Sequence, residues 1–316
     1  MSDAVPYTPR RSASSRFEPL RGLTYHVNSW GDESLASPER PPVVMMHGWM
    51  DVGVSFQFVV DELAALDTAR GTAPRWVLAP DWRGFGRTPP QPGTDSYWFP
   101  DYVADLDALL RRLWPHGPVD LLGHSMGGNV VMLYAGTRPQ RIRRLVNLEG
   151  FGMPRTQPEQ APARMAQWLD ELAEPARLKP YPDLAAVAAR LQANDPRLRA
   201  DRAMWLAEHW PQPVAAVDGG GWQLQADPAH KHVNPMLYRV DEALATWAAI
   251  EAPLLWVEGL QTQTGRWWGD RYSKAEFHQR LDVVRQARRE TLDDCGHMLH
   301  HDQPAALAAL LHDFLR

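Results

Sequence analysis

The 316-residue sequence has little of several features that mark particular classes of protein. Its one cysteine, Cys295, excludes an internal disulfide and fits a reducing compartment. No apolar run approaches the roughly 20 residues of a membrane-spanning helix. The first sixteen residues, MSDAVPYTPRRSASSR, are polar and lack the apolar stretch of a secretory signal. We therefore expect a cytoplasmic protein without a membrane partner, in which residues 1–16 form a flexible leader.

The chain also lacks an excess of positive charge. Its formal net charge is −5, and no basic stripe with interleaved aromatic residues is visible, so we expect no nucleic-acid partner. Hydrophobic residues make up 44% of the chain and charged residues 22%, which is ordinary for a globular protein with a buried core. Tryptophan is frequent, at 14 residues, and excess tryptophan often lines apolar pockets.

Short apolar segments alternate with amphipathic segments along most of the chain. Apolar runs typical of buried strands are VVMM (43–46), WVLA (76–79), VDLL (119–122), RRLVNL (143–148) and PLLWV (253–257). Apolar residues at helical spacing occupy 55–66, 101–114, 126–136 and 304–315. This alternation predicts an α/β fold with a mostly parallel sheet and helices on both of its faces.

The alternation breaks between residues 151 and 235, where prolines are frequent and helix-like pieces occur without a strong strand. Strand-like segments resume at 253–257 and 290–292, and they would lack a sheet to join if the rest of the chain were a separate domain. We therefore predict one core, residues 17–150 and 236–316, and a helical cap, residues 151–235, over the strand ends.

The stretch LLGHSMGGNV, residues 121–130, places Ser125 where an apolar strand turns into a helix-like segment. Residues 123–127 fit the pattern G-x-S-x-G, a sharp strand-to-helix turn that exposes the serine hydroxyl. The pattern alone is a modest signal, because glycine and serine are common turn residues. To act as a nucleophile, the serine needs an adjacent base, and the base needs an orienting partner.

Polar residues follow several of the predicted strands, and parallel sheets bind ligands beyond those strand ends. His297 lies in a loop between the last strand and the last helix, and we predict that it is the base. Carboxylates follow two strands, at Glu149 and Glu258. A serine, a carboxylate and a histidine thus follow one another along the chain at strand ends, which is more specific than the serine motif alone.

A tetrahedral intermediate on Ser125 would need two hydrogen-bond donors. In this architecture they are the backbone N–H groups of the residue after the nucleophile and of a residue in the loop after an earlier strand. These residues are Met126 and Trp49. The helix that starts after Ser125 adds its positive end at the same place.

Four motifs in this sequence carry a resemblance to a known family: HGWMD (47–51), DWRGFGRT (81–88), GHSMGG (123–128) and GHMLHHDQP (296–304). From about residue 20 onward the chain resembles the α/β-hydrolase superfamily, and within it the serine hydrolase-like proteins close to bacterial esterases. The resemblance implies a sheet of about eight strands, a helical cap, and a Ser–acid–His triad that works without a cofactor.

The sequence lacks the aspartate that most members of this superfamily carry in the loop after the penultimate strand. Residues 253–259 fit the pattern P-x-x-x-x-x-G, but no aspartate follows at 260–262. Some relatives instead carry a glutamate after the preceding strand, in a stretch similar to NLEGFGMP of this chain. We therefore assign Glu149 as the acid and keep Glu258 and Asp270 as alternatives.

A second group of residues resembles a metal cluster: Asp293, Asp294, Cys295, His297, His300, His301 and Asp302. Its spacing matches no common zinc pattern, and adjacent histidines at the start of a helix do not easily face one ion. We therefore expect no metal site, and we interpret His300 and His301 as residues that cap the last helix or line the entrance.

The predicted cap should determine substrate choice. Residues in or near it that could line an apolar pocket are Met153, Trp168, Trp205, Trp210 and Trp222, although each tryptophan fits the core of the cap equally well. We expect a small-molecule partner, a small to medium apolar ester cleaved through an acyl-enzyme on Ser125. The same residues could instead cleave a carbon–carbon bond, a lactone or a thioester, or form a peracid. The fold could also serve as a non-catalytic ligand-binding protein.

Overall fold

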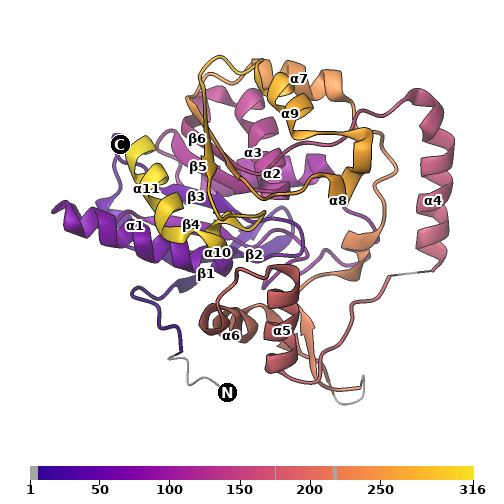
Figure 1. The fold of residues 1–316 in the computed structure, drawn as a ribbon, viewed down its shortest axis with the longest axis horizontal. Helices are drawn as coiled ribbons and strands as arrows, with labels where there is room; N and C mark the ends of the chain where they lie inside the picture. Colours follow the sequence, from indigo (N-terminus) through magenta and orange to yellow (C-terminus); the bar gives the residue numbers. More distant parts are fainter. Residues whose placement is uncertain (1–5, 175, 216–218) are drawn as a thin grey trace.

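The computed structural model describes residues 6–174, 176–215 and 219–316 (Figure 1). At its centre is an eight-stranded sheet with the order β1-β2-β4-β3-β5-β6-β9-β10. These strands are β1 (Ser14–Leu20), β2 (Leu23–Trp30), β3 (Val43–Met46), β4 (Val77–Pro80), β5 (Val119–His124), β6 (Ile142–Leu148), β9 (Leu254–Gly259) and β10 (Ala287–Leu292). Strand β2 is antiparallel to both of its neighbours, and all pairs from β4 to β10 are parallel. The predicted mostly parallel, eight-stranded sheet is confirmed.

Helices cover both faces of this sheet (Figure 1). One face carries α1 (Gln57–Ala69), α10 (Leu299–Asp302) and α11 (Pro304–Phe314), and the other carries α2 (Phe99–Leu113), α3 (Met126–Thr137), α7 (Val240–Ala248) and α9 (Lys274–Leu281). Successive residues of β3 point to opposite faces, with Val44 and Met46 in the core on the α2–α3 side and Val43 and Met45 in the core on the α1–α11 side. A strand buried on both faces must be apolar throughout, which explains the sequence VVMM.

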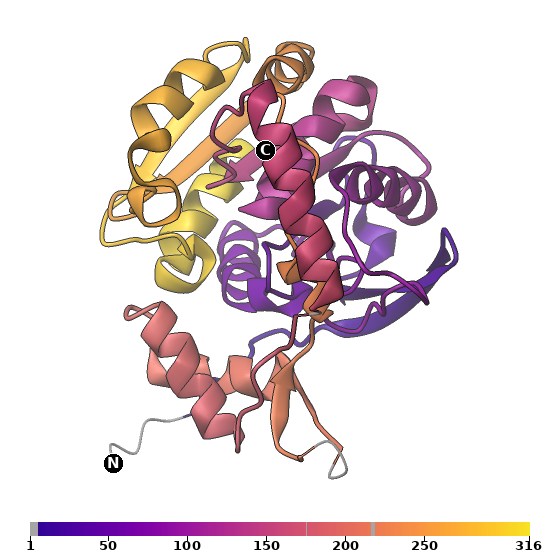
Figure 2. The same ribbon diagram turned by 90° about the vertical axis from the view of Figure 1, so that its right-hand side faces the viewer.

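A long segment between β6 and β9 leaves the sheet. It contains α4 (Ala161–Ala173), α5 (Leu184–Asn194), α6 (Ala200–His209) and a hairpin of β7 (Pro211–Pro213) and β8 (Trp222–Leu224), all within the predicted cap. Helices α5 and α6 share a small apolar core that also includes Val52 and Phe58 of the sheet domain. Helix α4 runs separately along the side of the molecule, away from α5 and α6 (Figures 1 and 2).

Part of the predicted leader is built into the fold. The Tyr7 ring packs edge-on against two aromatic rings, and its hydroxyl donates to Asp61 Oδ2 at 2.6 Å. From Ser14 onward the chain pairs with β2. The prediction that residues 1–16 are flexible is therefore wrong for this part, because aromatic packing and strand pairing hold it in place. Residues 1–5 lie outside the described residues.

Among the helices that the structure describes, none has both the length and the apolar character needed to cross a membrane.

Candidate active site

Ser125 lies at the turn between β5 and α3 with φ 52° and ψ −114°, a backbone conformation that is unfavourable for an L-residue. The turn is tight on both sides. A Cβ atom at Gly123 would overlap the backbone carbonyl of Gly127, and one at Gly127 would overlap that of Met46. The two glycines of G-x-S-x-G are therefore required by the close approach of helix to strands, and they leave the serine half-buried at the strand end.

The structure brings the three residues of the predicted triad into one hydrogen-bonded chain. His297 Nε2 lies 3.0 Å from Ser125 Oγ, and His297 Nδ1 lies 2.7 Å from Glu149 Oε2. The other carboxylate oxygen, Oε1, accepts a hydrogen bond from the backbone N–H of Gly259 at 2.7 Å. Each residue follows the carboxyl end of a different strand, β5, β6 or β10, so the parallel sheet is what gathers them.

Burial shifts the protonation of the acid and the base. Removal from water raises the pKa of Glu149 to about 8, although the Gly259 N–H favours the ionised carboxylate. Removal from water also lowers the pKa of His297, to about 4. The two groups are in contact, so they take up and lose protons as a pair. An imidazole kept neutral with Nε2 beside a serine hydroxyl is able to accept that hydroxyl's proton.

The two alternative acids lie elsewhere. The Glu258 carboxylate lies 2.8 Å from His278 Nε2 and accepts from Trp256 Nε1 at 3.2 Å, beside α9. Asp270 is exposed in the loop after β9. Within the described residues, Glu149 is the carboxylate that His297 contacts.

Both backbone segments that carry the predicted oxyanion donors adjoin the nucleophile. Met126 is the first residue of α3, where helix N–H groups have no partner within the helix. A Cβ atom at Gly48 would lie 3.2 Å from Ser125 Cβ, so the loop after β3 that holds Trp49 passes directly beside the serine. The Trp49 side chain points elsewhere for its hydrogen bond, since its Nε1 donates to the carbonyl of His230 at 3.1 Å.

Ser125 and His297 open onto a cavity of about 1190 Å³. Its walls include Val187 and Leu191 of α5, and Trp210 at the end of α6. Of the residues predicted to form the pocket, Trp210 is the one that lines this cavity.

The prediction is wrong for Met153, Trp168 and Trp205, none of which lines this cavity. Trp205 packs against Phe58, with the ring centres 5.5 Å apart, in the core beneath α5 and α6. Trp168 is on α4, and its Nε1 donates to Ser96 Oγ. Met153 is exposed near the start of the insertion. Trp168 misses the cavity because α4 lies apart from α5 and α6, and Trp205 misses it because its ring faces the core beneath those two helices. Local sequence spacing encodes neither arrangement. Trp222, on β8, also lies off the cavity wall.

Sequence reasoning missed Trp267, whose ring lies edge-on to the His297 ring with the centres 4.6 Å apart. It lines the cavity from α8 (Gly265–Trp268), a short helix in the loop after β9. The position of QTQTGRWWGD directly after a parallel strand was the available signal, because side chains after such strands face the ligand site.

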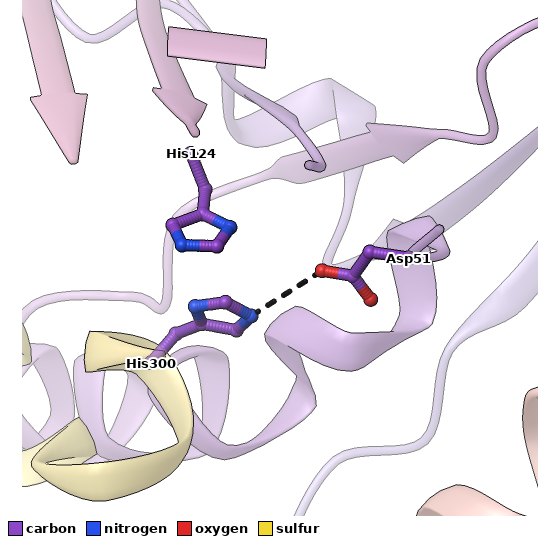
Figure 3. A group of neighbouring side chains, drawn as sticks. All are labelled: Asp51, His124 and His300. Carbon is purple, nitrogen blue, oxygen red and sulfur yellow. Dashed lines mark ion pairs between the residues drawn. The ribbon is translucent and has the colours of Figure 1, made fainter. Parts of the chain in front are cut away.

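A buried polar group lies next to Ser125: Asp51, His124 and His300 (Figure 3). His300 Nε2 lies 3.6 Å from Asp51 Oδ2, and one ligand-capable atom from each side chain lies within 4.8 Å of the other two. Burial lowers the pKa of His124 to about 3, so its imidazole is neutral. Imidazole nitrogens and a carboxylate could together hold a transition-metal ion. Of the cluster considered from the sequence, His300 alone belongs to this group.

The comparisons with known proteins agree with this architecture. The sequence profile of the α/β hydrolase fold matches residues 41–304. A 3-hydroxybutyrate-oligomer hydrolase from Cupriavidus necator is 30% identical over 252 residues, which cover 77% of this chain and 78% of that protein. A serine hydrolase-like protein from Danio rerio is 27% identical over 322 residues, covering 98% of this chain and 90% of the relative.

A solved structure is similar over nearly its whole length. The thioesterase domain from the curacin biosynthetic pathway has a TM-score of 0.77 and 28% identity, covering 95% of this chain and 99% of that domain. Because the family profile spans most of the sequence, and the sheet order and strand-end site are in place, the chain belongs to the family of the α/β hydrolase fold.

Proposed function

We propose that this protein is a serine hydrolase that cleaves carboxylic esters through an acyl-enzyme on Ser125. The observation that carries the proposal is the hydrogen-bonded chain from Ser125 Oγ through His297 to Glu149, at the base of an open cavity. A serine, an imidazole and a buried carboxylate in this order supply a nucleophile, a base and the group that orients the base.

The reaction begins when His297 Nε2 takes the proton of Ser125 Oγ, which attacks the ester carbonyl carbon. The carbonyl oxygen becomes an oxyanion and receives hydrogen bonds from the backbone N–H groups of Met126 and Trp49. His297 then gives its proton to the leaving alcohol, and the acyl group remains on Ser125. Water repeats the sequence and releases the acid.

Glu149 keeps His297 in the productive tautomer. Its Oε2 accepts a hydrogen bond from the Nδ1–H group, so Nε2 presents a lone pair to the serine. The N–H of Gly259 holds the other carboxylate oxygen and fixes the orientation of the acid. The positive end of α3 also lies at Ser125, where it favours the developing oxyanion.

The relatives support this chemistry at the level of a hydrolase. The Cupriavidus necator protein is named for the hydrolysis of 3-hydroxybutyrate oligomers, which are carboxylic esters. We extend ester hydrolysis to this chain on that basis and on the site geometry. A thioester is the second candidate substrate, because a structure 28% identical to this chain is a thioesterase domain.

Active-site labelling and ester turnover test the proposal together. A fluorophosphonate probe should label the wild-type protein and fail to label Ser125→Ala. Turnover of p-nitrophenyl esters of increasing acyl length should fall on the order of a million-fold in that variant. Ser34→Ala, which changes an exposed serine far along the chain from the site, is the matched control and should keep full activity.

The possible results separate the alternatives. Near-normal turnover by Ser125→Ala would contradict the mechanism. Labelling of Ser125 without turnover of any oxygen ester would favour a thioester, a lactone or a carbon–carbon bond as the substrate. Absence of labelling in the folded wild-type protein would favour a non-catalytic ligand-binding role.

A further inference from the structure

The wall of the cavity carries more positive than negative charge, although the whole chain has a formal net charge of −5. The basic residues that line it are Lys179, Arg190, Arg197, Lys231 and Arg266, and the acidic residues are Asp51, Asp195 and Asp294. Neighbouring carboxylates neutralise only part of this positive charge.

Arg197 is already engaged within the protein. Its Nε lies 3.3 Å from Asp294 Oδ1, and its Nη2 donates to Gln261 Oε1. The other four basic side chains form no ion pair with any residue that the structure describes, and Lys231 Nζ donates to the backbone carbonyl of Arg177. We call these four residues, Lys179, Arg190, Lys231 and Arg266, the basic rim.

The three acidic residues do not cancel the basic rim. Asp294 is paired with Arg197, and Asp51 is buried at the base of the cavity beside His300. Asp195 is buried near Asp302, and burial raises the pKa of its carboxyl to about 7, which leaves it with less negative charge near neutral pH. The rim therefore contributes a net positive field inside a cleft, where low-dielectric walls concentrate field lines.

The rim and the nucleophile belong to different parts of the same cavity. Lys179 and Arg190 come from the segment that leads into α5 and from α5 itself, and both are exposed. Arg266 lies on α8, next to the Trp267 ring that contacts His297. A substrate whose carbonyl reaches Ser125 therefore extends its other end along a wall that leads to exposed positive charge.

We propose that the basic rim recognises a carboxylate at the far end of the substrate. The favoured substrates are then esters with an anionic terminus, such as a half-ester of a dicarboxylic acid or a short chain of ester-linked hydroxy acids. This inference rests on the proposed ester hydrolysis and adds the substrate class. The rim cations are exposed, so each contributes modestly and their effect is screened by salt.

A charged and uncharged pair of esters tests the inference. Mono-p-nitrophenyl adipate carries a free carboxylate at its far end, and p-nitrophenyl methyl adipate carries a methyl ester there. Wild-type kcat/KM should be about tenfold higher for the charged ester at low ionic strength, and this ratio should fall towards one at about 1 M salt.

The double variant Lys179→Gln, Arg190→Gln should lower the ratio about three- to tenfold, while kcat/KM for the methyl ester stays unchanged. Arg285→Gln is the matched control, because Arg285 is exposed and does not line the cavity. It should leave the ratio as in the wild-type protein.

The failure of this inference and the failure of ester hydrolysis give different results. Equal turnover of both esters, unchanged in the double variant, would show that the basic rim does not recognise a carboxylate, while the proposed ester hydrolysis would stand. If neither ester is turned over, the proposed ester hydrolysis fails. Calorimetry on Ser125→Ala then measures the affinity for each ester and tests whether the basic rim binds the carboxylate. Tighter binding of the charged ester that weakens in the rim variant supports it, and equal binding of the two esters overturns it.

Discussion

Glu149 combines features that cost free energy at a single residue. Its side chain has no exposed surface, its pKa is raised to about 8 by burial, and its backbone has φ 57°. Costly conformations at one position are typical of functional sites, where the surrounding structure holds them. Here the surrounding structure holds the Glu149 carboxylate in contact with His297 Nδ1.

Replacing this carboxylate should abolish most turnover without disturbing the site's shape. In Glu149→Gln the amide can donate to Nδ1, which stabilises the wrong imidazole tautomer, so kcat should fall about 10⁴-fold. Glu258→Gln is the matched control, since that carboxylate contacts His278, and it should stay within a fewfold of wild type. Turnover of p-nitrophenyl butyrate by both variants checks this. Loss of turnover in the Glu258 variant alone would assign the role of the acid to Glu258 on β9.

The same substitution should increase stability in alkaline solution. The pKa of Glu149 is higher in the folded protein, at about 8, than its ordinary value of 4.5, so the folded state holds this proton more tightly than the unfolded state. The stabilisation is therefore present at low pH and lost as the pH rises through about 8. Glu149→Gln cannot ionise, and we expect its Tm to exceed that of wild type at pH above 8. An equal or lower Tm there would contradict the raised pKa.

Activity should increase with pH over the range in which the stabilisation by Glu149 is lost. In the proposed mechanism, the active pair has an ionised Glu149 and a neutral His297 with its proton on Nδ1. One added proton places a hydrogen on Nε2, whether the imidazole becomes charged or the protonated carboxyl donates to Nδ1, and the base is lost. Because burial raises the pKa of Glu149 to about 8, kcat/KM should decrease as the pH falls through about 8. A profile that is flat from pH 6 to 9 would contradict this expectation.

At the scale of elements, one buried ionic cluster joins the loop after β4, the turn after β1, and α2. Asp105, on α2, is fully buried and accepts from Arg83 Nη2 at 2.7 Å and from Arg21 Nη1 at 2.6 Å. The Tyr25 hydroxyl of β2 also donates to it. Arg83 belongs to the DWRGFG segment, so this cluster sets the path of the chain next to the strand ends.

Removing the buried carboxylate should therefore be strongly destabilising. Asp105→Ala removes the fully buried carboxylate and leaves the Arg83 guanidinium with only the partly exposed Asp101 carboxylate, 3.5 Å away, so the free energy of unfolding should decrease by about 3–5 kcal/mol. Arg111→Ala removes an exposed ion pair with Asp107 on the same helix and should cost about 1 kcal/mol or less. Urea denaturation of both variants measures the difference. Similar losses in the two would contradict the importance of burial.

At the scale of the whole molecule, the N-terminal segment helps to attach α5 and α6 to the sheet domain. The Tyr7 ring packs against Phe58 of α1 and Trp205 of α6, while its hydroxyl binds Asp61 of α1. The cavity above Ser125 is bounded by α5, so this attachment also fixes one cavity wall.

Loss of the Tyr7 ring should loosen that wall. In Tyr7→Ala the apolar contact with both helices is removed, which costs about 1.5–3 kcal/mol. Amide hydrogen exchange should then become faster in residues 184–209 and stay unchanged in α3. Tyr7→Phe keeps the ring and loses only the hydroxyl contact, so it should exchange nearly as slowly as wild type. Uniform acceleration over the whole chain would indicate a general loss of stability instead.

Much of the strand-end site could be predicted from local patterns. The G-x-S-x-G turn is required by backbone contacts between residues near in sequence, such as Gly123 with Gly127, so it leaves a local signature. Apolar runs buried on two faces identify the central strands, and residues directly after parallel strands must share one edge of the sheet. These short-range constraints selected Ser125 and His297 and left Glu149 and Glu258 as candidate acids, and the resemblance to relatives with a glutamate after the preceding strand then selected Glu149. The structure places Ser125, Glu149 and His297 in contact.

Which surfaces meet across the molecule depended on the tertiary structure. The sequence by itself determined the class of fold and the order of the strand-end residues, because both follow from periodicity and turn chemistry. Only the fold decided that Tyr7 packs on α6, that Trp168 lies on a separate helix, and that Arg190 and Arg266 face one cavity. Amphipathic helices each have an apolar side, but that side alone does not specify its partner, since packing between distant segments depends on the shape of both surfaces.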